Sequence, residues 1–223
     1  MERRNSHQSL LSDKKVNPSE EFSETTASPA VKMEVETEEK PSVMFYLKQR
    51  VVLQNLLLMA YMWSAVSFCY YMISFQLKYL PGDIYENSLA SSGSELLAYL
   101  IGGLCYSFLK IRKSFAISFV IALVGGILIL TLGVKDVSYM PLFVTLAKFG
   151  ISGGFVIVYV ATVDLFPTLF VATAIGICNF FSRFLTILAP QVAELDPPIP
   201  MSIFIALSAL GLILSFFIIE KKK

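Results

Sequence analysis

The feature that most constrains this 223-residue chain is a series of six long apolar runs. Each run is long enough to cross a hydrocarbon core of ~30 Å as a helix that rises ~1.5 Å per residue. A lipid-facing backbone must satisfy its own hydrogen bonds, and the runs are too long and continuous for barrel strands. The sequence therefore predicts an all-α multipass membrane protein with spans at residues 51–78, 88–109, 114–134, 139–163, 169–190 and 200–219.

The charged residues divide the chain into three parts. Residues 1–48 are rich in Ser, Thr, Glu, Lys and Pro, a composition that cannot bury enough apolar surface to order itself. We expect this segment to be disordered, as a solvated linker in preference to a phosphorylated regulatory tail. Residues 49–220 should form the six-helix transmembrane domain, and residues 221–223 a short basic tail.

Lysine and arginine near the span ends set the expected orientation. They gather on one side of the membrane, and cytoplasmic loops are the ones enriched in these residues. Both termini should therefore be cytoplasmic. The basic residues on this side are Lys48, Arg50, Lys110, Arg112, Lys113 and Lys221 to Lys223.

Composition and motifs argue against several function classes. A net charge of +1 gives no reason to expect a nucleic-acid partner. The motif Gly150-Ile151-Ser152-Gly153 resembles a serine nucleophile in a membrane helix, but the one histidine, His7, lies far away in the N-terminal segment. Lys148 is the one nearby base, and we interpret Ser152 as a packing residue. No phosphate loop or metal-ligand cluster is present, so we expect no enzyme, no cofactor and no metal site.

Three charged residues stand inside the spans, where each costs roughly 2.5–3.5 kcal/mol on insertion scales. Arg183 is deep in its span, beyond the reach of easy snorkelling, whereas Lys148 could extend to the outer interface and Glu95 lies about two turns in. Aromatic side chains cluster near them. Most aromatics in a bundle only pack, but charges facing aromatic rings also suit a site for a small organic ion.

Several ordered stretches carry a resemblance to a known family. The chain resembles the C-terminal half of major facilitator superfamily transporters, and within them the organic cation and anion transporters of solute carrier family 22. The resemblance covers roughly residues 45–220. The matching stretches are MWSAVSFCYYMIS (62–74), GDIYENSLASSGSELLAYLIGG (82–103), KFGISGGFVIVYVATVDLFPT (148–168) and GICNFFSRFLTILAP (176–190).

The resemblance implies a fold and an activity. The six spans would correspond to helices seven to twelve of a twelve-helix carrier, which moves a small organic ion by alternating access between two halves. Residues 1–48 would correspond to the cytoplasmic linker between the halves, and the plasma membrane is the expected location. The partners would be the lipid bilayer, a small organic ion for which an anion is one candidate, and a second half from the same or another chain.

The resemblance also implies roles for single residues. Tyr71, Phe155 and Tyr159 match aromatic residues that contact substrate in the family. Arg183 matches an arginine that faces the central cavity in members that carry anions, so it would bind or balance an anionic group. The remaining candidates are expected to pair with each other or with the substrate, and they are Glu95 and Lys148.

The cytoplasmic gate departs from the family pattern. Where the family has a sequence like D-x-x-G-R-R between helices eight and nine, this chain has residues 107–113, without the acid or the glycine. Val171 replaces an arginine that follows the Pro-Thr turn. Gating is expected to be loosened, rewired or absent. The residues expected to take part in it are Asp164, Pro167, Lys110, Arg112 and Lys113.

One half of such a carrier cannot enclose the usual cavity, so three interpretations stay open. The preferred one is that the sequence is a fragment of a longer gene product, because it begins within what resembles the linker. The alternatives are a half-size carrier that works as a dimer and a non-transporting scaffold or regulatory half-transporter. A channel has no support, because no filter-like loop or ring of acids is evident.

Overall fold

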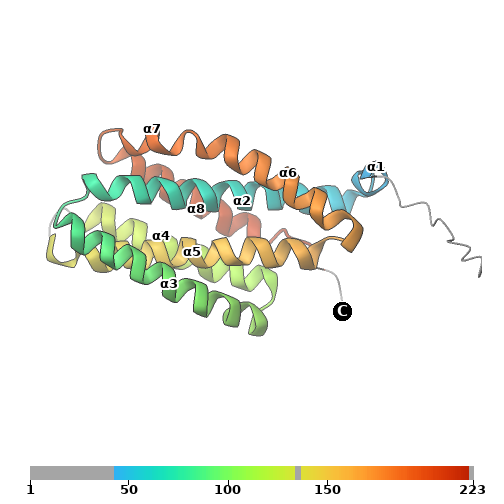
Figure 1. The fold of residues 1–223 in the computed structure, drawn as a ribbon, viewed down its shortest axis with the longest axis horizontal. Helices are drawn as coiled ribbons and strands as arrows, with labels where there is room; N and C mark the ends of the chain where they lie inside the picture. Colours follow the sequence, from blue (N-terminus) through green and yellow to red (C-terminus); the bar gives the residue numbers. More distant parts are fainter. Residues whose placement is uncertain (1–42, 134–136, 221–223) are drawn as a thin grey trace, which may run out of the picture. The chain divides into compact units, whose positions relative to one another are not determined.

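A computed structural model describes residues 43–133 and 137–220, and within these ranges the predicted all-α class is confirmed (Figure 1). The regular elements there are α-helices and two single 3₁₀ turns. The turns are η1 (Leu77–Tyr79) and η2 (Val137–Tyr139). The helices are α1 (Val43–Leu47), α2 (Arg50–Gln76), α3 (Ile84–Phe108), α4 (Ile111–Thr131), α5 (Met140–Leu165), α6 (Thr168–Thr186), α7 (Ala189–Ala193) and α8 (Ile199–Ser215).

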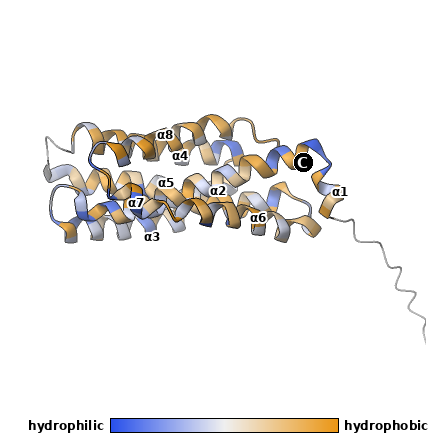
Figure 2. Ribbon diagram, turned by 90° about the horizontal axis from the view of Figure 1, so that it is seen from above, coloured by the Kyte–Doolittle hydropathy of each residue, from blue (hydrophilic) through white to orange (hydrophobic). Residues whose placement is uncertain are grey.

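Six helical stretches coincide in place with the six predicted spans, but they differ in apolar character. Among the described residues, four stretches are long and apolar enough to cross a membrane: Arg50–Tyr79, Ile111–Thr131, Met140–Leu165 and Thr168–Ala193. Helix α8 is apolar but shorter, at 17 residues. Helix α3 has 25 residues, yet its two glutamates and its serines lower its hydropathy, and it is paler than α8 in Figure 2. For α3 and α8, membrane crossing stays a prediction.

The long helices pack so that α2 and α5 lie side by side with a flanking helix on each outer side. Helix α3 packs along α5, and α6 packs along α2 (Figure 1). Helix α4 packs against both α5 and α8, so α4 and α8 cover the opposite face of the α2–α5 pair. This arrangement leaves one face formed by α3, α5, α2 and α6 in that order, which we call the open face.

Small residues, Gly150 and Gly154 on α5, bring α4 and α5 into close contact. A Cβ atom added at Gly150 would collide with the backbone nitrogen of Ala122 and would lie 2.7 Å from the carbonyl oxygen of Ser118. The Ser118 hydroxyl donates to the Gly150 carbonyl at 2.6 Å, and a Cβ at Gly154 would lie 2.9 Å from the same hydroxyl. Only residues without a side chain permit this approach of two backbones.

Part of the segment that the sequence predicted to be disordered is helical. Residues 43–47 belong to the segment expected to be disordered, but they form the helix α1. The exposed fraction of Tyr46 is 9%, and its ring centroid lies 5.4 Å from that of Phe170 on α6. Burial of this one aromatic ring supplies the contact that a polar segment would lack. The remainder of the predicted disordered segment, residues 1–42, and the basic tail lie outside the described residues.

Candidate functional site

Lys148, on the open face side of α5, is turned inward instead of toward a membrane interface. Its exposed fraction is 2%, and its ammonium group donates to the Tyr70 carbonyl at 3.3 Å and to the Ser74 hydroxyl. The ammonium also lies 3.4 Å from the centroid of the Tyr70 ring, which is a cation–π contact. Lys148 therefore ties α5 to the C-terminal half of α2.

Glu95 on α3 is held by two tyrosine hydroxyls. Tyr70 from α2 donates to its Oε1 atom at 2.5 Å, and Tyr99, one turn further along α3, donates to the same atom at 2.7 Å. Hydrogen bonds to an ionised carboxylate are stronger than those between neutral groups. Glu95 and Lys148 form no direct ion pair, and Tyr70 stands between them with its hydroxyl on one and its ring on the other.

Arg183, near the end of α6, is exposed and makes fewer side-chain contacts than Lys148 or Glu95 does. Its Nη1 atom donates to the Tyr71 hydroxyl on α2 at 3.2 Å. The one salt bridge among the described residues joins Lys78 and Glu194, so Arg183 makes no ion pair there. With respect to the described part of the chain, Arg183 therefore presents a positive charge without an acidic partner on the open face.

Aromatic rings connect these charged groups. Tyr70 meets Tyr71 edge-on at 5.3 Å between ring centroids and meets Phe155 at 5.4 Å. Phe155 lies 6.1 Å from Tyr159, whose ring lies 4.4 Å from that of Trp63. The exposed fraction of Tyr159 is 42%, whereas that of Trp63 is 1%. The row of aromatic rings therefore joins the buried Trp63 on α2 to the exposed Tyr159 on α5, which an aromatic ligand can contact.

All six residues proposed as substrate ligands fall on this one set of helices. The sequence prediction did not assign roles to Tyr70, Ser74 or Tyr99, which hold the charged groups. The sequence did carry a spacing signal for two of them. Ser74 stands four residues after Tyr70, and Tyr99 stands four residues after Glu95. Residues four apart share one face of a helix. Nothing in the sequence indicates how α2, α3 and α5 align.

The Ser152 hydroxyl is buried and, within the described part of the chain, has no hydrogen-bond partner. The bonded partners of Lys148 lie on α2, so the serine and the lysine do not form a nucleophile–base pair. The interpretation of Ser152 as a packing residue agrees with this geometry. Among the described residues there is also no cluster of His, Cys, Asp and Glu that could hold a metal ion.

Comparison with known proteins relates the chain, as a sequence, to a family. No protein-family model matches the chain. Human organic cation/carnitine transporter 2 is 31% identical over 165 residues, which is 71% of this chain and 29% of the relative. Mouse solute carrier family 22 member 4 is 35% identical over 136 residues, and mouse organic anion transporter 3 is 31% identical over 166 residues. The chain is a sequence relative of the solute carrier family 22 transporters.

The predicted resemblance is thereby confirmed, but it covers only a small part of each relative's length. The matched regions are 60% and 71% of this chain but only 24% and 30% of the two mouse relatives. The chain thus spans less than a third of the length of these solute carrier 22 relatives. Its apolar helices and its relatives together make it a membrane protein of solute-carrier type.

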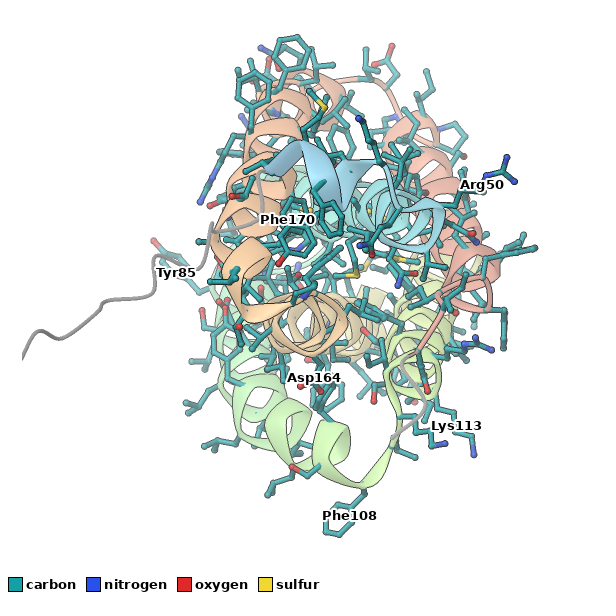
Figure 3. All side chains as sticks on the ribbon, turned by 90° about the vertical axis from the view of Figure 1, so that its right-hand side faces the viewer. Arg50, Tyr85, Phe108, Lys113, Asp164 and Phe170 are labelled. Atoms are coloured by element: carbon teal, nitrogen blue, oxygen red, sulfur yellow. The ribbon has the colours of Figure 1, made fainter. Side chains whose placement is uncertain are left out.

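One end of the bundle holds the residues predicted to gate such a carrier. We call it the basic end, and Figure 3 views it with Arg50 and Lys113 pointing outward from its rim. Asp164 accepts a hydrogen bond at 2.7 Å from the Tyr106 hydroxyl at the end of α3. Pro167 lines a shallow hollow with residues of α2 and of the segment after α8.

Arg112 turns to the segment after α8 and not to Asp164. Its Nε atom donates to the Ile218 carbonyl at 2.6 Å, and its backbone N–H donates to Glu220 at 3.0 Å. Asn55 on α2 binds the same segment in both directions, donating to the Ile219 carbonyl at 2.9 Å and accepting from the Ile219 N–H at 3.0 Å. Two of the predicted gating residues, Arg112 and Asp164, therefore have partners that the sequence did not indicate.

Proposed function

We propose that the chain forms one wall of a substrate pathway through the membrane and moves a small organic anion by alternating access. Three observations support this proposal. Charged and aromatic side chains gather on one face of the bundle, the helices are long and apolar, and the sequence relatives are named as organic cation and anion transporters.

The observation that carries the proposal is the exposed Arg183 beside Tyr71. A cation within an apolar span is costly and is usually retained for a function. Its guanidinium can bind a carboxylate with two parallel hydrogen bonds. The exposed ring of Tyr159 and the half-buried ring of Phe155 offer apolar contact to the body of the same substrate. An aromatic carboxylate meets both requirements.

The pathway needs a second wall. The open face carries the site, and the relatives have more than three times the matched length, so the other wall is another six-helix half in the same gene product or in a partner chain. The basic end is cytoplasmic in this proposal, in accordance with its lysine and arginine residues, and the plasma membrane is the location. The Tyr106–Asp164 bond and the Arg112 contacts are then the cytoplasmic ties that open and close with each cycle.

Binding and uptake of radiolabelled benzoate test the proposal. The purified chain should bind benzoate in equilibrium dialysis, and Arg183→Ala should weaken binding about tenfold or more, as expected when a charge-assisted hydrogen bond is lost. Arg183→Lys should retain part of the affinity because it keeps the charge. Arg50→Ala is the matched control, since it removes an exposed arginine at the basic end, away from the open face, and should leave benzoate binding unchanged.

Uptake measurements distinguish a half-size carrier from a chain that needs a separate second half. Uptake into liposomes by the chain alone indicates a half-size carrier that assembles with itself. Binding without uptake indicates that another half must complete the pathway. Failure of the purified chain to bind benzoate, or equal binding by wild type and Arg183→Ala, contradicts the proposed function and favours a scaffold or regulatory role.

A further inference from the structure

We propose that Tyr70 holds Lys148 and Glu95 together as an internally compensated pair. Arg183 is then the charge that remains to select the substrate, so the open face prefers organic anions to organic cations. This inference rests on the proposed function, because it concerns which ions the same site accepts. Tyr70 is then a specificity-determining residue, although its own side chain is uncharged.

Tyr70 contacts the two charged groups through different parts of its side chain. The negative face of its ring lies 3.4 Å from the Lys148 ammonium, while its hydroxyl donates to Glu95 at 2.5 Å. Phe155 and Tyr71 pack against the ring at 5.4 Å and 5.3 Å between centroids and so limit its rotation. A positive and a negative charge thus lie on either side of one fixed ring, where their fields largely cancel for a ligand on the open face.

Lys148 has little left to offer a substrate. An ammonium group has three donors, and this one reaches the Tyr70 carbonyl, the Ser74 hydroxyl and the Tyr70 ring. The exposed fraction of the side chain is 2%. A substrate that took this charge would have to displace the ammonium from a part-buried carbonyl, a part-buried hydroxyl and the Tyr70 ring, which costs the free energy of all three contacts.

Glu95 is protected in the same way, whereas Arg183 is not. Tyr70 and Tyr99 both donate to the Glu95 carboxylate, so an arriving cation must compete with two short charge-assisted bonds. Arg183 is exposed and makes one side-chain hydrogen bond, at 3.2 Å, to Tyr71. An anion meets an available partner on this face, and a cation does not.

The test compares two ions of similar size and opposite charge, benzoate and phenyltrimethylammonium, by equilibrium dialysis with the purified chain. Wild type should bind benzoate the more tightly. Tyr70→Phe keeps the ring over Lys148 but removes the hydroxyl from Glu95, and it should raise the affinity for phenyltrimethylammonium roughly tenfold. Its affinity for benzoate should stay within about twofold, because Arg183 is untouched.

Two further variants test the same link. Tyr99→Phe removes the other hydroxyl but leaves the link through Tyr70, so its gain in cation affinity should be smaller, about threefold or less. Glu95→Gln combined with Tyr70→Phe removes the charge that the cation seeks, and the gain should vanish. If Tyr70→Phe binds benzoate normally and gains no affinity for the cation, the inference is overturned.

Thermal unfolding tests the hydrogen bond between Tyr70 and Glu95 without any ligand. Tyr70→Phe and Glu95→Gln, singly and together, form a double-mutant cycle across the hydrogen bond. The double variant should lose clearly less stability than the sum of the single losses, and additive losses would refute the pairing. If wild type binds neither ion, the proposed function fails by itself, and the cycle still tests the link through Tyr70.

Discussion

Replacing Gly150 by alanine should separate two of the most closely packed helices of the bundle. The new Cβ atom would meet the backbone of Ala122 and the carbonyl oxygen of Ser118. Backbone atoms cannot rotate away as a side chain does, so α4 and α5 must move apart. Overpacking of this kind typically costs about 1–3 kcal/mol.

Gly153 provides a matched control on the same helix. Among the described residues, no heavy atom beyond its own turn of helix lies within 4 Å of where its Cβ would stand. Both substitutions gain about 0.5–1 kcal/mol from the better helix propensity of alanine, so the difference between the two variants isolates the collision. That difference should be about 1–3 kcal/mol in favour of Gly153→Ala.

Thermal unfolding of the detergent-solubilised variants measures this difference. For a chain of this size, 1 kcal/mol corresponds to about 2–4 °C in Tm. Gly150→Ala should therefore unfold about 2–12 °C below Gly153→Ala. Equal unfolding temperatures would refute the reasoning, because they would mean that α4 and α5 do not approach each other at Gly150.

The basic end supplies two further predictions. Asn55→Ala should lower the free energy of unfolding by about 1–3 kcal/mol, because it leaves the N–H and carbonyl of Ile219 unpaired, whereas Gln54→Ala should cost little, since its bond is long and exposed. Unfolding of the two variants in the same detergent checks this, and equal losses would contradict it. Arg112→Ala should speed amide hydrogen exchange in residues 216–220 several-fold, because the arginine binds that segment directly. Lys113→Ala is its control, and equal exchange in both variants would show that Arg112 does not hold the segment.

Hydropathy was sufficient to predict the helices, because a long apolar run in lipid has few alternatives to a helix. It did not predict the helix α1. Residues 43–47 lie in a segment whose overall composition is polar, and Tyr46 there packs against Phe170 on α6. Such a contact depends on the neighbouring helix, and the composition averaged over residues 1–48 does not reveal it.

The charged residues of the site could be found one at a time, since charge in an apolar span is rare. Their partners could not. Whether Lys148 meets substrate, lipid or protein depends on the alignment of α5 with α2, and the structure places Tyr70 and Ser74 against it. Likewise Arg112 binds a backbone carbonyl at Ile218, and a backbone acceptor looks the same at every position in a sequence.

The pair of hydrogen bonds between Asn55 and Ile219 can form only late in the synthesis of the chain. Asn55 lies near the start of the first long helix and is 3% exposed, and its partner lies 164 residues later in the chain. Because synthesis proceeds from the N-terminus, this amide remains unpaired while five long helices are made. Its bonds form only once the segment after α8 has left the ribosome. The contact therefore marks the completion of the bundle, and a chain interrupted before residue 219 keeps an unsatisfied amide in its first long helix.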